Sequence, residues 1–284
     1  MSGYELLDSG GGRKLERIGG HTVDRQAPGA VWRPRSPAAA WRDVDGVHVR
    51  SDKGGGHWEW RGREPQRWTV RHAGLDLELR PTPFGHIGLF AEHAETWDWL
   101  RARLERLAEI RGEAPRLLNL FAYTGGSSLA AAQAGARVTH VDSARGVVDW
   151  ARRNAALNGL EAAPVRWIVE DARKFAQRAR RREERYDAVI LDPPSFGRGK
   201  GGEVWKIEDH LDGLLDDLAA ITAPGPGLVF FSCHTAGYSP VALENLLGDR
   251  FGRPPLVVES GEMTVPETSG RALPAGTFFR ASLD

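Results

Sequence analysis

The stretch "YDAVILDPPSFGRG", residues 186–199, joins an apolar segment to an acid, two prolines and a glycine-containing loop. Its first seven residues are typical of a buried strand that ends in turn residues. Each proline fixes its own φ, and the residue before a proline is driven out of the helical region. The chain must therefore leave the sheet at Asp192 in an extended conformation. Because that conformation presents a side chain to a ligand, we expect Asp192, Pro193 and Pro194 to border a functional site.

Strands and helices alternate on both sides of this segment. The pattern predicts strands at 116–121, 137–142, 165–170, 186–192, 227–233, 255–259 and 277–282. It predicts helices at 94–111, 126–136, 144–159, 171–185, 206–222 and 240–248. Strands that alternate with helices form a mostly parallel sheet with helices on both faces, so we expect a doubly wound, Rossmann-like α/β fold.

The composition changes near residue 85. The part before it is rich in Gly, Arg, Pro and Trp, and five of the ten tryptophans lie in the first 70 residues. Short alternating stretches there predict a small β-rich or irregular module at 1–85, followed by the α/β domain at 86–284. Interleaved arginines and tryptophans fit phosphate contacts and base stacking in substrate recognition, and they fit equally the core of a small module.

The whole chain is electrically balanced. Its 284 residues carry 38 Lys+Arg and 38 Asp+Glu, which excludes a globally basic nucleic-acid surface but not local basic patches. We find no apolar run long enough to span a bilayer and no leader pattern, and therefore expect a cytoplasmic protein that does not contact membranes. A single cysteine excludes internal disulfides, and no cluster of residues has metal-ligand spacing. The sequence gives no indication of the oligomeric state.

The residues at the strand ends predict a ligand site. Parallel α/β sheets bind ligands at the carboxyl ends of their strands. The first strand leads into a turn with Gly125, and the next three end at Asp142, at 170–171 and at Asp192; the fifth ends at Cys233. An acid at the end of the second strand can accept hydrogen bonds from both hydroxyls of a ribose.

The glycine turn distinguishes two classes of cofactor. A dinucleotide needs the spacing G-x-G-x-x-G so that its pyrophosphate can rest on a helix N-terminus, and "FAYTGGSSLA", residues 121–130, lacks it. S-adenosylmethionine has no phosphate, so a looser glycine turn is sufficient. Asp171 is then suited to accept a hydrogen bond from the adenine amino group. S-adenosylmethionine is favoured, and a nicotinamide-dependent oxidoreductase remains the alternative from the residues alone.

Three segments carry a family resemblance: "LLNLFAYTGGSSLAAAQAGARVTHVDSARGVVDWARRNAALNGL", "WIVEDARKF" and "RYDAVILDPPSFGRG". From about residue 84 to 284 the chain resembles the S-adenosylmethionine-dependent methyltransferases related to the bacterial large-subunit rRNA base methyltransferases. The resemblance implies a cofactor loop made of Phe121, Ala122, Tyr123, Thr124 and Gly125. It also implies that Asp142 holds the ribose, that Asp171 meets the adenine edge, and that Asp192 and its two prolines border the transferred methyl.

The resemblance further implies a base in RNA, of the ribosomal class, as the methyl acceptor. Asp192 and the proline carbonyls would accept hydrogen bonds from an exocyclic amine, and Phe196 would either stack on an extruded base or plug the loop. Methylation of a cytosine carbon needs a thiolate, for which Cys233 is the only candidate; its alternative role is that of a small buried hydrophobe. A small molecule or a protein amine as acceptor, and a cofactor-binding protein without activity, stay open.

Overall fold

The computed structural model describes residues 3–51, 54–199, 202–224, 227–252 and 256–283. The chain forms two compact units. Unit 1 consists of residues 1–94 together with the segment 264–275, and unit 2 consists of residues 95–263 and 276–284. The expected N-terminal module ended near residue 85 and did not include 264–275. That return segment belongs to unit 1 through contacts far apart in sequence, such as the hydrogen bond from Ser9 Oγ to Glu267 Oε1.

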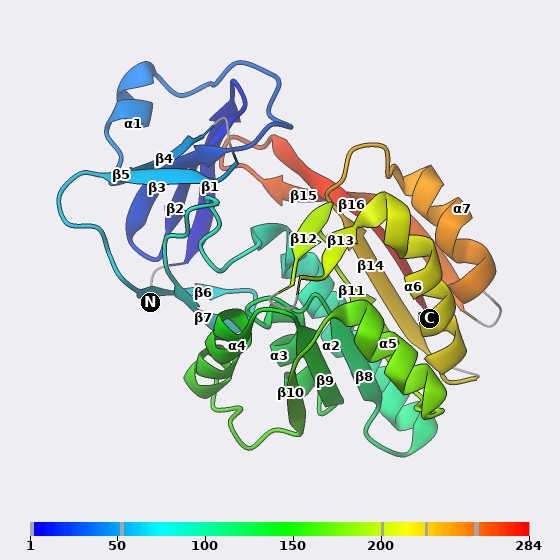
Figure 1. Ribbon diagram of the computed structural model, residues 1–284. Coiled ribbons are helices and arrows are strands. Elements are labelled where there is room, and N and C mark those ends of the chain that lie inside the picture. Colours follow the sequence, from blue (N-terminus) through cyan, green and yellow to red (C-terminus); the bar gives the residue numbers. More distant parts are fainter. Residues whose placement is uncertain (1–2, 52–53, 200–201, 225–226, 253–255, 284) are drawn as a thin grey trace. The chain divides into compact units, whose positions relative to one another are not determined.

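Unit 1 is β-rich, as predicted. Its five-stranded sheet has the order β1-β2-β3-β4-β5, in which only β3 and β4 run parallel. The strands are β1 (Tyr4–Gly10), β2 (Arg13–Ile18), β3 (His21–Gln26), β4 (Gly46–Arg50) and β5 (Gly56–Trp60). A separate hairpin pairs β6 (Trp68–His72) with β7 (Leu75–Leu79), and two short helical segments complete the unit, α1 (Ala38–Arg42) and a 3-10 turn (Ala91–His93). Figure 1 labels α1 and the strands β1 to β7.

The tryptophans of unit 1 are partly buried packing residues. Trp58 stacks on Trp60 with ring centroids 5.3 Å apart, and Trp60 meets Trp68 edge-on at 6.2 Å. Trp60 lies so close to Gly46 that a Cβ there would fall 2.7 Å from the indole ring. The indole nitrogens of Trp58 and Trp68 donate to the carbonyls of Thr82 and Ile18. These contacts favour a structural role for this set of tryptophans.

Unit 2 contains the predicted doubly wound α/β fold. Its sheet has the order β10-β9-β8-β11-β14-β16-β15, with β16 antiparallel to β14 and the first five strands mutually parallel (Figure 1). The strands are β8 (Arg116–Leu120), β9 (Arg137–Asp142), β10 (Val165–Val169), β11 (Ala188–Leu191), β14 (Leu228–Cys233), β15 (Val257–Pro266) and β16 (Ala272–Ser282). A small ribbon, β12 (Phe196–Arg198) and β13 (Val204–Lys206), follows β11.

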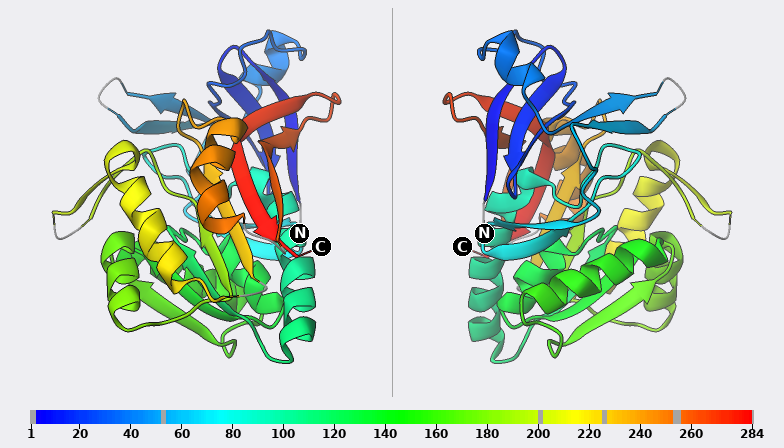
Figure 2. Two further views of the ribbon diagram at one scale, coloured as in Figure 1. Left: turned by 90° about the vertical axis from the view of Figure 1, so that its right-hand side faces the viewer. Right: turned by 90° about the vertical axis from the view of Figure 1, so that its left-hand side faces the viewer.

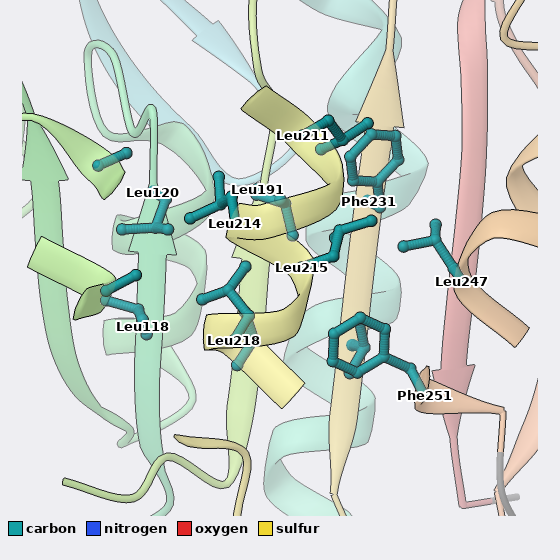
Figure 3. Close-up of a cluster of buried hydrophobic side chains, with 14 of the residues drawn as sticks. Leu118, Leu120, Leu191, Leu211, Leu214, Leu215, Leu218, Phe231, Leu247 and Phe251 are labelled. Carbon is teal, nitrogen blue, oxygen red and sulfur yellow. The ribbon is translucent and has the colours of Figure 1, made fainter. Parts of the chain in front are cut away.

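Helices cover both faces of this sheet, as the apolar strands require. They are α2 (Ala94–Arg111), α3 (Gly126–Gln133), α4 (Arg145–Leu157), α5 (Ala172–Arg181), α6 (Ile207–Ile221) and α7 (Pro240–Phe251). The main core joins α5, α6 and α7 to one face; Figure 3 shows leucines of α6 over β8, β11 and β14, and the left view of Figure 2 shows α6 and α7 in yellow and orange. On the other face, Trp99 of α2 packs on Phe230. No helix among the described residues is both long and apolar enough to cross a membrane.

Candidate active site

The loop after β8 has an unusual backbone. Phe121 and Tyr123 have φ of 55° and 48°, and Gly125 has φ of 91°. Positive φ is uncommon for residues other than glycine, and backbone strain of this kind is often found at ligand-binding sites. The backbone N–H of Tyr123 donates to Asp142 Oδ2 at 3.0 Å, which ties the loop to the end of the neighbouring strand. The predicted cofactor loop is therefore held in one conformation by a predicted cofactor residue.

Asp142 ends β9 and is half-buried. Its Oδ1 accepts a hydrogen bond from the backbone N–H of Ala144 at 2.9 Å, and its Oδ2 accepts the one from Tyr123. Burial raises the pKa of Asp142, while these two N–H groups act in the opposite direction. Each carboxylate oxygen has a second lone pair. The group is thus fixed in orientation and retains acceptor capacity for the two hydroxyls of a ribose.

Asp171 has a structural task as well as its predicted one. It is the N-cap of α5, where its Oδ1 accepts from the backbone N–H of Lys174 at 3.1 Å. This cap fixes the carboxylate at the end of β10, next to Asp142 on β9. The preceding Glu170 forms an ion pair with Arg178. Both acids line the pocket described next, and Asp171 is the one whose carboxylate is held by a helix N-terminus.

An open pocket of about 420 Å³ lies at these strand ends. It is lined by Phe121, Val141, Asp142, Ser143, Glu170, Asp171, Ala172, Pro194, Gly197, Arg198, Gly199, Glu203 and Trp205. Four predicted site residues meet here, one from each of four strand ends. The acid of β9, the acid of β10 and the aromatic ring of Phe121 fit an adenosine group by their chemistry.

Other predicted cofactor residues belong to the loop but do not line this pocket. They are Ala122, Tyr123, Thr124 and Gly125. Asp192, expected to border the transferred methyl, is likewise not among the lining residues. Thr124 is buried, and its carbonyl accepts from Asn154 Nδ2 at 2.9 Å. Gly125 lies against Ala151 and could not carry a side chain without a close contact, since a Cβ would be 3.1 Å from Ala151 Cβ. Thr124 and Gly125 therefore contribute to the loop through their backbone atoms.

The segment 192–195 is neither helix nor strand, as the two prolines predict. Pro193 is buried and Pro194 is exposed. Asp192 Oδ1 lies 3.4 Å from His234 Nε2, which follows the parallel strand β14. The carbonyl of Pro194 accepts a hydrogen bond from the indole of Trp205 at 2.6 Å. Two further side chains thus contact this segment: His234 at Asp192 and Trp205 at Pro194.

Trp205 is the main residue that the sequence analysis missed. The expected helix began at 206, and the residues before it were expected to form a loop; instead, Trp205 lies in β13, is only 4% exposed, and packs on Phe121 with ring centroids 4.9 Å apart. The alternation Val204-Trp205-Lys206 after a glycine-rich turn is a weak hairpin signal that could have identified it. Trp205 links the cofactor loop to Pro194.

Cys233 lies in the hydrophobic core. It ends β14, is 1% exposed, and belongs to the cluster that joins the sheet to α6 and α7. Burial raises the pKa of the thiol, and the charge of Asp192 adds to the effect, while hydrogen bonds from Thr235 oppose it. The thiolate, which a nucleophile requires, is therefore disfavoured in this conformation.

In unit 1, several of the basic and aromatic residues interleaved in the sequence have partners within the unit. Arg13 pairs with Asp24 at 2.6 Å, and Lys14 pairs with the buried Glu16 at 3.0 Å. Trp41 donates its indole N–H to Asp8 Oδ2, and Trp32 donates to the carbonyl of Ser9. These partners favour the structural interpretation of the basic and aromatic residues over nucleic-acid contact.

Known proteins match this architecture. A family model described as "S-adenosylmethionine-dependent methyltransferase" matches residues 31–244. The chain belongs to that family. Its cofactor is S-adenosylmethionine, and the strand-end carboxylate and pocket described above are chemically suited to hold it. The methyltransferase fold class expected from the sequence is confirmed.

Curated relatives of this methyltransferase chain are bacterial. The Ribosomal RNA large subunit methyltransferase K/L of Alcanivorax borkumensis is 31% identical over 192 residues, which are 66% of this chain and 26% of that protein. The protein of the same name from Pseudomonas syringae is 34% identical over 196 residues, covering 68% of this chain and 24% of that protein. The chain thus spans about a quarter of the length of these relatives.

Solved structures match over nearly the whole methyltransferase chain. The SAM-dependent methyltransferase from Agrobacterium tumefaciens is 37% identical with a TM-score of 0.91, covering 100% of this chain and 91% of that one. A protein assigned as a methyltransferase and complexed with SAH is 20% identical with a TM-score of 0.75, covering 99% of this chain and 75% of that one. The second likeness concerns the fold alone.

Proposed function

We propose that this methyltransferase transfers a methyl group to a base in RNA, with ribosomal RNA as the substrate class. The observation that supports the proposal is that Pro194 lines the cofactor pocket two residues after Asp192, in a chain about one-third identical to rRNA methyltransferases over about two thirds of its length. Bound S-adenosylmethionine supplies an activated methyl group on its sulfonium. The residues of this chain have to hold the acceptor in line with it, since positioning provides much of the rate of such a displacement.

Asp192 is suited to hold a base amine. Its carboxylate is a hydrogen-bond acceptor beside His234 at 3.4 Å, and the carbonyl of Pro194 can accept a second bond besides the one from Trp205. The acceptor nitrogen loses a proton when it gains the methyl group. Asp192, or His234 through Asp192, lies where that proton can be received.

A cytosine carbon is the second candidate acceptor. The observation in its favour is the position of Cys233 at the end of β14, the strand paired with the one that leads to Asp192. The raised pKa and the burial of the thiol disfavour it. Methylation of a base amine is therefore the chemistry that the described conformation supports better.

The test is the transfer of label from methyl-tritiated S-adenosylmethionine into total RNA, taken from cells that lack this protein and digested to nucleosides. We expect label in an N-methylated base, at least 100-fold less with Asp192→Ala, and nearly unchanged labelling with Cys233→Ala. Label in 5-methylcytidine that disappears with Cys233→Ala would establish the second candidate instead. Label in protein or small molecules but not in RNA would refute the RNA proposal.

A further inference from the structure

The ribbon of β12 and β13 has two chemically different faces. Phe196 pairs with Lys206, Gly197 with Trp205, and Arg198 with Val204. Since successive side chains of a strand point to opposite sides, Gly197 and Trp205 share one face. Both line the cofactor pocket, and Trp205 is buried there. The inward face of the ribbon is therefore accounted for by the site already described.

The outward face, which we call the ribbon face, is defined by Phe196, Arg198, Val204 and Lys206; of these, Arg198 also contributes to the lining of the cofactor pocket. All four are exposed, Phe196 by 51% and Val204 by 40%. The Arg198 guanidinium lies over the Phe196 ring, 5.6 Å from its centroid. A ring that is half exposed has a face open to solvent, so packing within the loop does not use the whole of Phe196. The face combines a flat apolar ring with two cations.

The cations of the ribbon face are weakly engaged. Lys206 Nζ lies 3.5 Å from Asp209 Oδ2, with both side chains about half exposed. Such surface pairs contribute little and exchange readily for another anion. Within the part of the chain that the structure describes, Arg198 has no carboxylate partner. Both positive charges are available to a phosphate.

We propose that the ribbon face binds the single-stranded RNA that flanks the target base. This inference rests on the proposed function. Phe196 follows Pro194 by two residues, so nucleotides next to a base held at Asp192 pass over the ribbon. One base stacks on Phe196, and Arg198 and Lys206 contact phosphates. Stacking platforms beside basic side chains are how proteins hold single strands, whereas an acidic peptide has no group that stacks on the ring.

The test is the binding of a fluorescein-labelled single-stranded RNA of mixed sequence, about 12 nucleotides long, to the full chain at saturating SAH. Phe196→Ala should weaken binding roughly tenfold without changing its salt dependence. The double variant Arg198→Gln/Lys206→Gln should weaken it at least tenfold and reduce the slope of log Kd against log salt by about 1.4, because each phosphate contact contributes about 0.7. As the matched control, Arg181→Gln/Arg182→Gln removes two exposed charges from the far end of α5 and should change affinity less than twofold.

The outcomes separate the two proposals. If the wild type methylates RNA and the ribbon variants bind RNA as it does, the ribbon inference is wrong and the proposed function stands. If the wild type methylates no RNA, both are wrong. Equal losses of affinity for polyglutamate and for RNA in the ribbon variants would make the face a general anion surface and overturn its assignment to RNA.

Discussion

At the scale of single residues, the site depends on carboxylates whose environments differ. Asp142 is held by two backbone N–H groups and has a pKa raised by burial. Asp192 lies beside an exposed histidine and borders solvent. We propose that the first is an acceptor for the cofactor, and that the second receives the acceptor base and its proton.

Asp142 predicts a pH dependence of cofactor binding. The ribose hydroxyls need the carboxylate form, which is lost as the pH falls through the raised pKa of Asp142. Affinity for S-adenosylmethionine should therefore begin to fall at a higher pH than an ordinary aspartate gives. Calorimetric titrations between pH 8 and pH 4 measure this. With Asp142→Asn the affinity should be weak and flat over that range; a wild-type affinity that stays constant down to pH 4 would contradict the assignment.

The same residues show what the sequence could predict. Asp142, Asp171 and Asp192 were predictable because parallel strands end at one edge of a sheet, so strand ends can be compared without knowing the packing. Trp205 was not, since the three residues of β13 are too short for a period and the helix signal of α6 follows at once. The proximity of His234 to Asp192 was not predictable either, because His234 follows β14 directly and the alternation of a strand does not show which side chain faces the next strand's end.

At the scale of elements, the start of α3 is the most tightly packed part of the cofactor loop. A Cβ on Gly126 would lie 2.3 Å from Trp97 Cζ2, although Trp97 comes from α2. Gly213, inside α6, has no atom within 4 Å of its Cβ position. A side chain therefore does not fit at Gly126, whereas there is room for one at Gly213.

This difference gives a matched pair of stability predictions. Gly126→Ala should lower the free energy of unfolding by about 1–3 kcal/mol, because Trp97 or the loop has to move. Gly213→Ala should raise it by about 0.5–1 kcal/mol, because alanine is the better helix former and meets open space. Urea unfolding of both variants measures the effects. Equal changes in the two would show that the packing of Trp97 on Gly126 does not control the stability of the loop.

Through Trp205, the β12–β13 ribbon holds the Pro194 carbonyl in position. The ribbon is attached to α5 by Lys174, whose Nζ lies 2.5 Å from Glu203 Oε1, and to Pro194 by the Trp205 indole. Trp205→Phe keeps a ring against Phe121 but deletes the hydrogen bond to the Pro194 carbonyl. We expect kcat to fall roughly tenfold, in line with a net loss of about 1–2 kcal/mol, and affinity for S-adenosylmethionine to fall much less.

Two further variants test whether the hydrogen bond of Trp205, rather than its packing, controls kcat. Trp205→Ala should reduce both kcat and cofactor affinity, since the packing on Phe121 is lost as well. Glu203→Gln weakens the attachment to α5 at an exposed lysine and should change kcat less than threefold. A Trp205→Phe variant with wild-type kcat would mean that the hydrogen bond does not position the Asp192–Pro194 segment.

At the scale of the whole molecule, the two units differ in how they respond to acid. In unit 2, burial lowers the pKa of His140 to about 3 from an ordinary value of 6.5. In unit 1, the neighbouring Arg25 and Lys14 lower the pKa of the buried Glu16 from 4.5 to about 2 against the opposing effect of burial. Both folded-state pKa values are depressed, so both groups stabilise the fold at high pH and lose that contribution on acidification.

The starting points of these losses differ. The contribution of His140 to unit 2 should begin to be lost as the pH falls below about 6.5, whereas that of Glu16 to unit 1 should last to about pH 4.5 and be lost toward pH 2. The lowered pKa of His48 gives unit 1 a smaller early loss. Urea unfolding at pH 7, 5.5 and 4, with brief proteolysis and mass spectrometry to assign the cut segments, separates the units. His140→Gln should remove the early loss in unit 2. Parallel losses in both units between pH 7 and 5.5 would contradict this account.

The fold of unit 2 could largely be predicted from the sequence, but the set of segments that form unit 1 could not. The expected helix at 94–111 and strand at 137–142 match α2 and β9, because each has a clear period and turn residues at its ends. The segment 264–275 joins unit 1 through buried pairs such as Arg271 with Asp8 at 2.7 Å. Contacts between residues 263 positions apart leave no local pattern that a reading of the chain can detect.

The most direct test of the central claim is a calorimetric titration of the full chain with S-adenosylmethionine and with NAD, repeated with Asp142→Ala. The account predicts one site for S-adenosylmethionine, no detectable binding of NAD, and an affinity at least tenfold weaker in the variant, whose circular dichroism should match the wild type. Unchanged affinity in Asp142→Ala would contradict the account, because the carboxylate on which the pocket is built would then have no part in holding the cofactor.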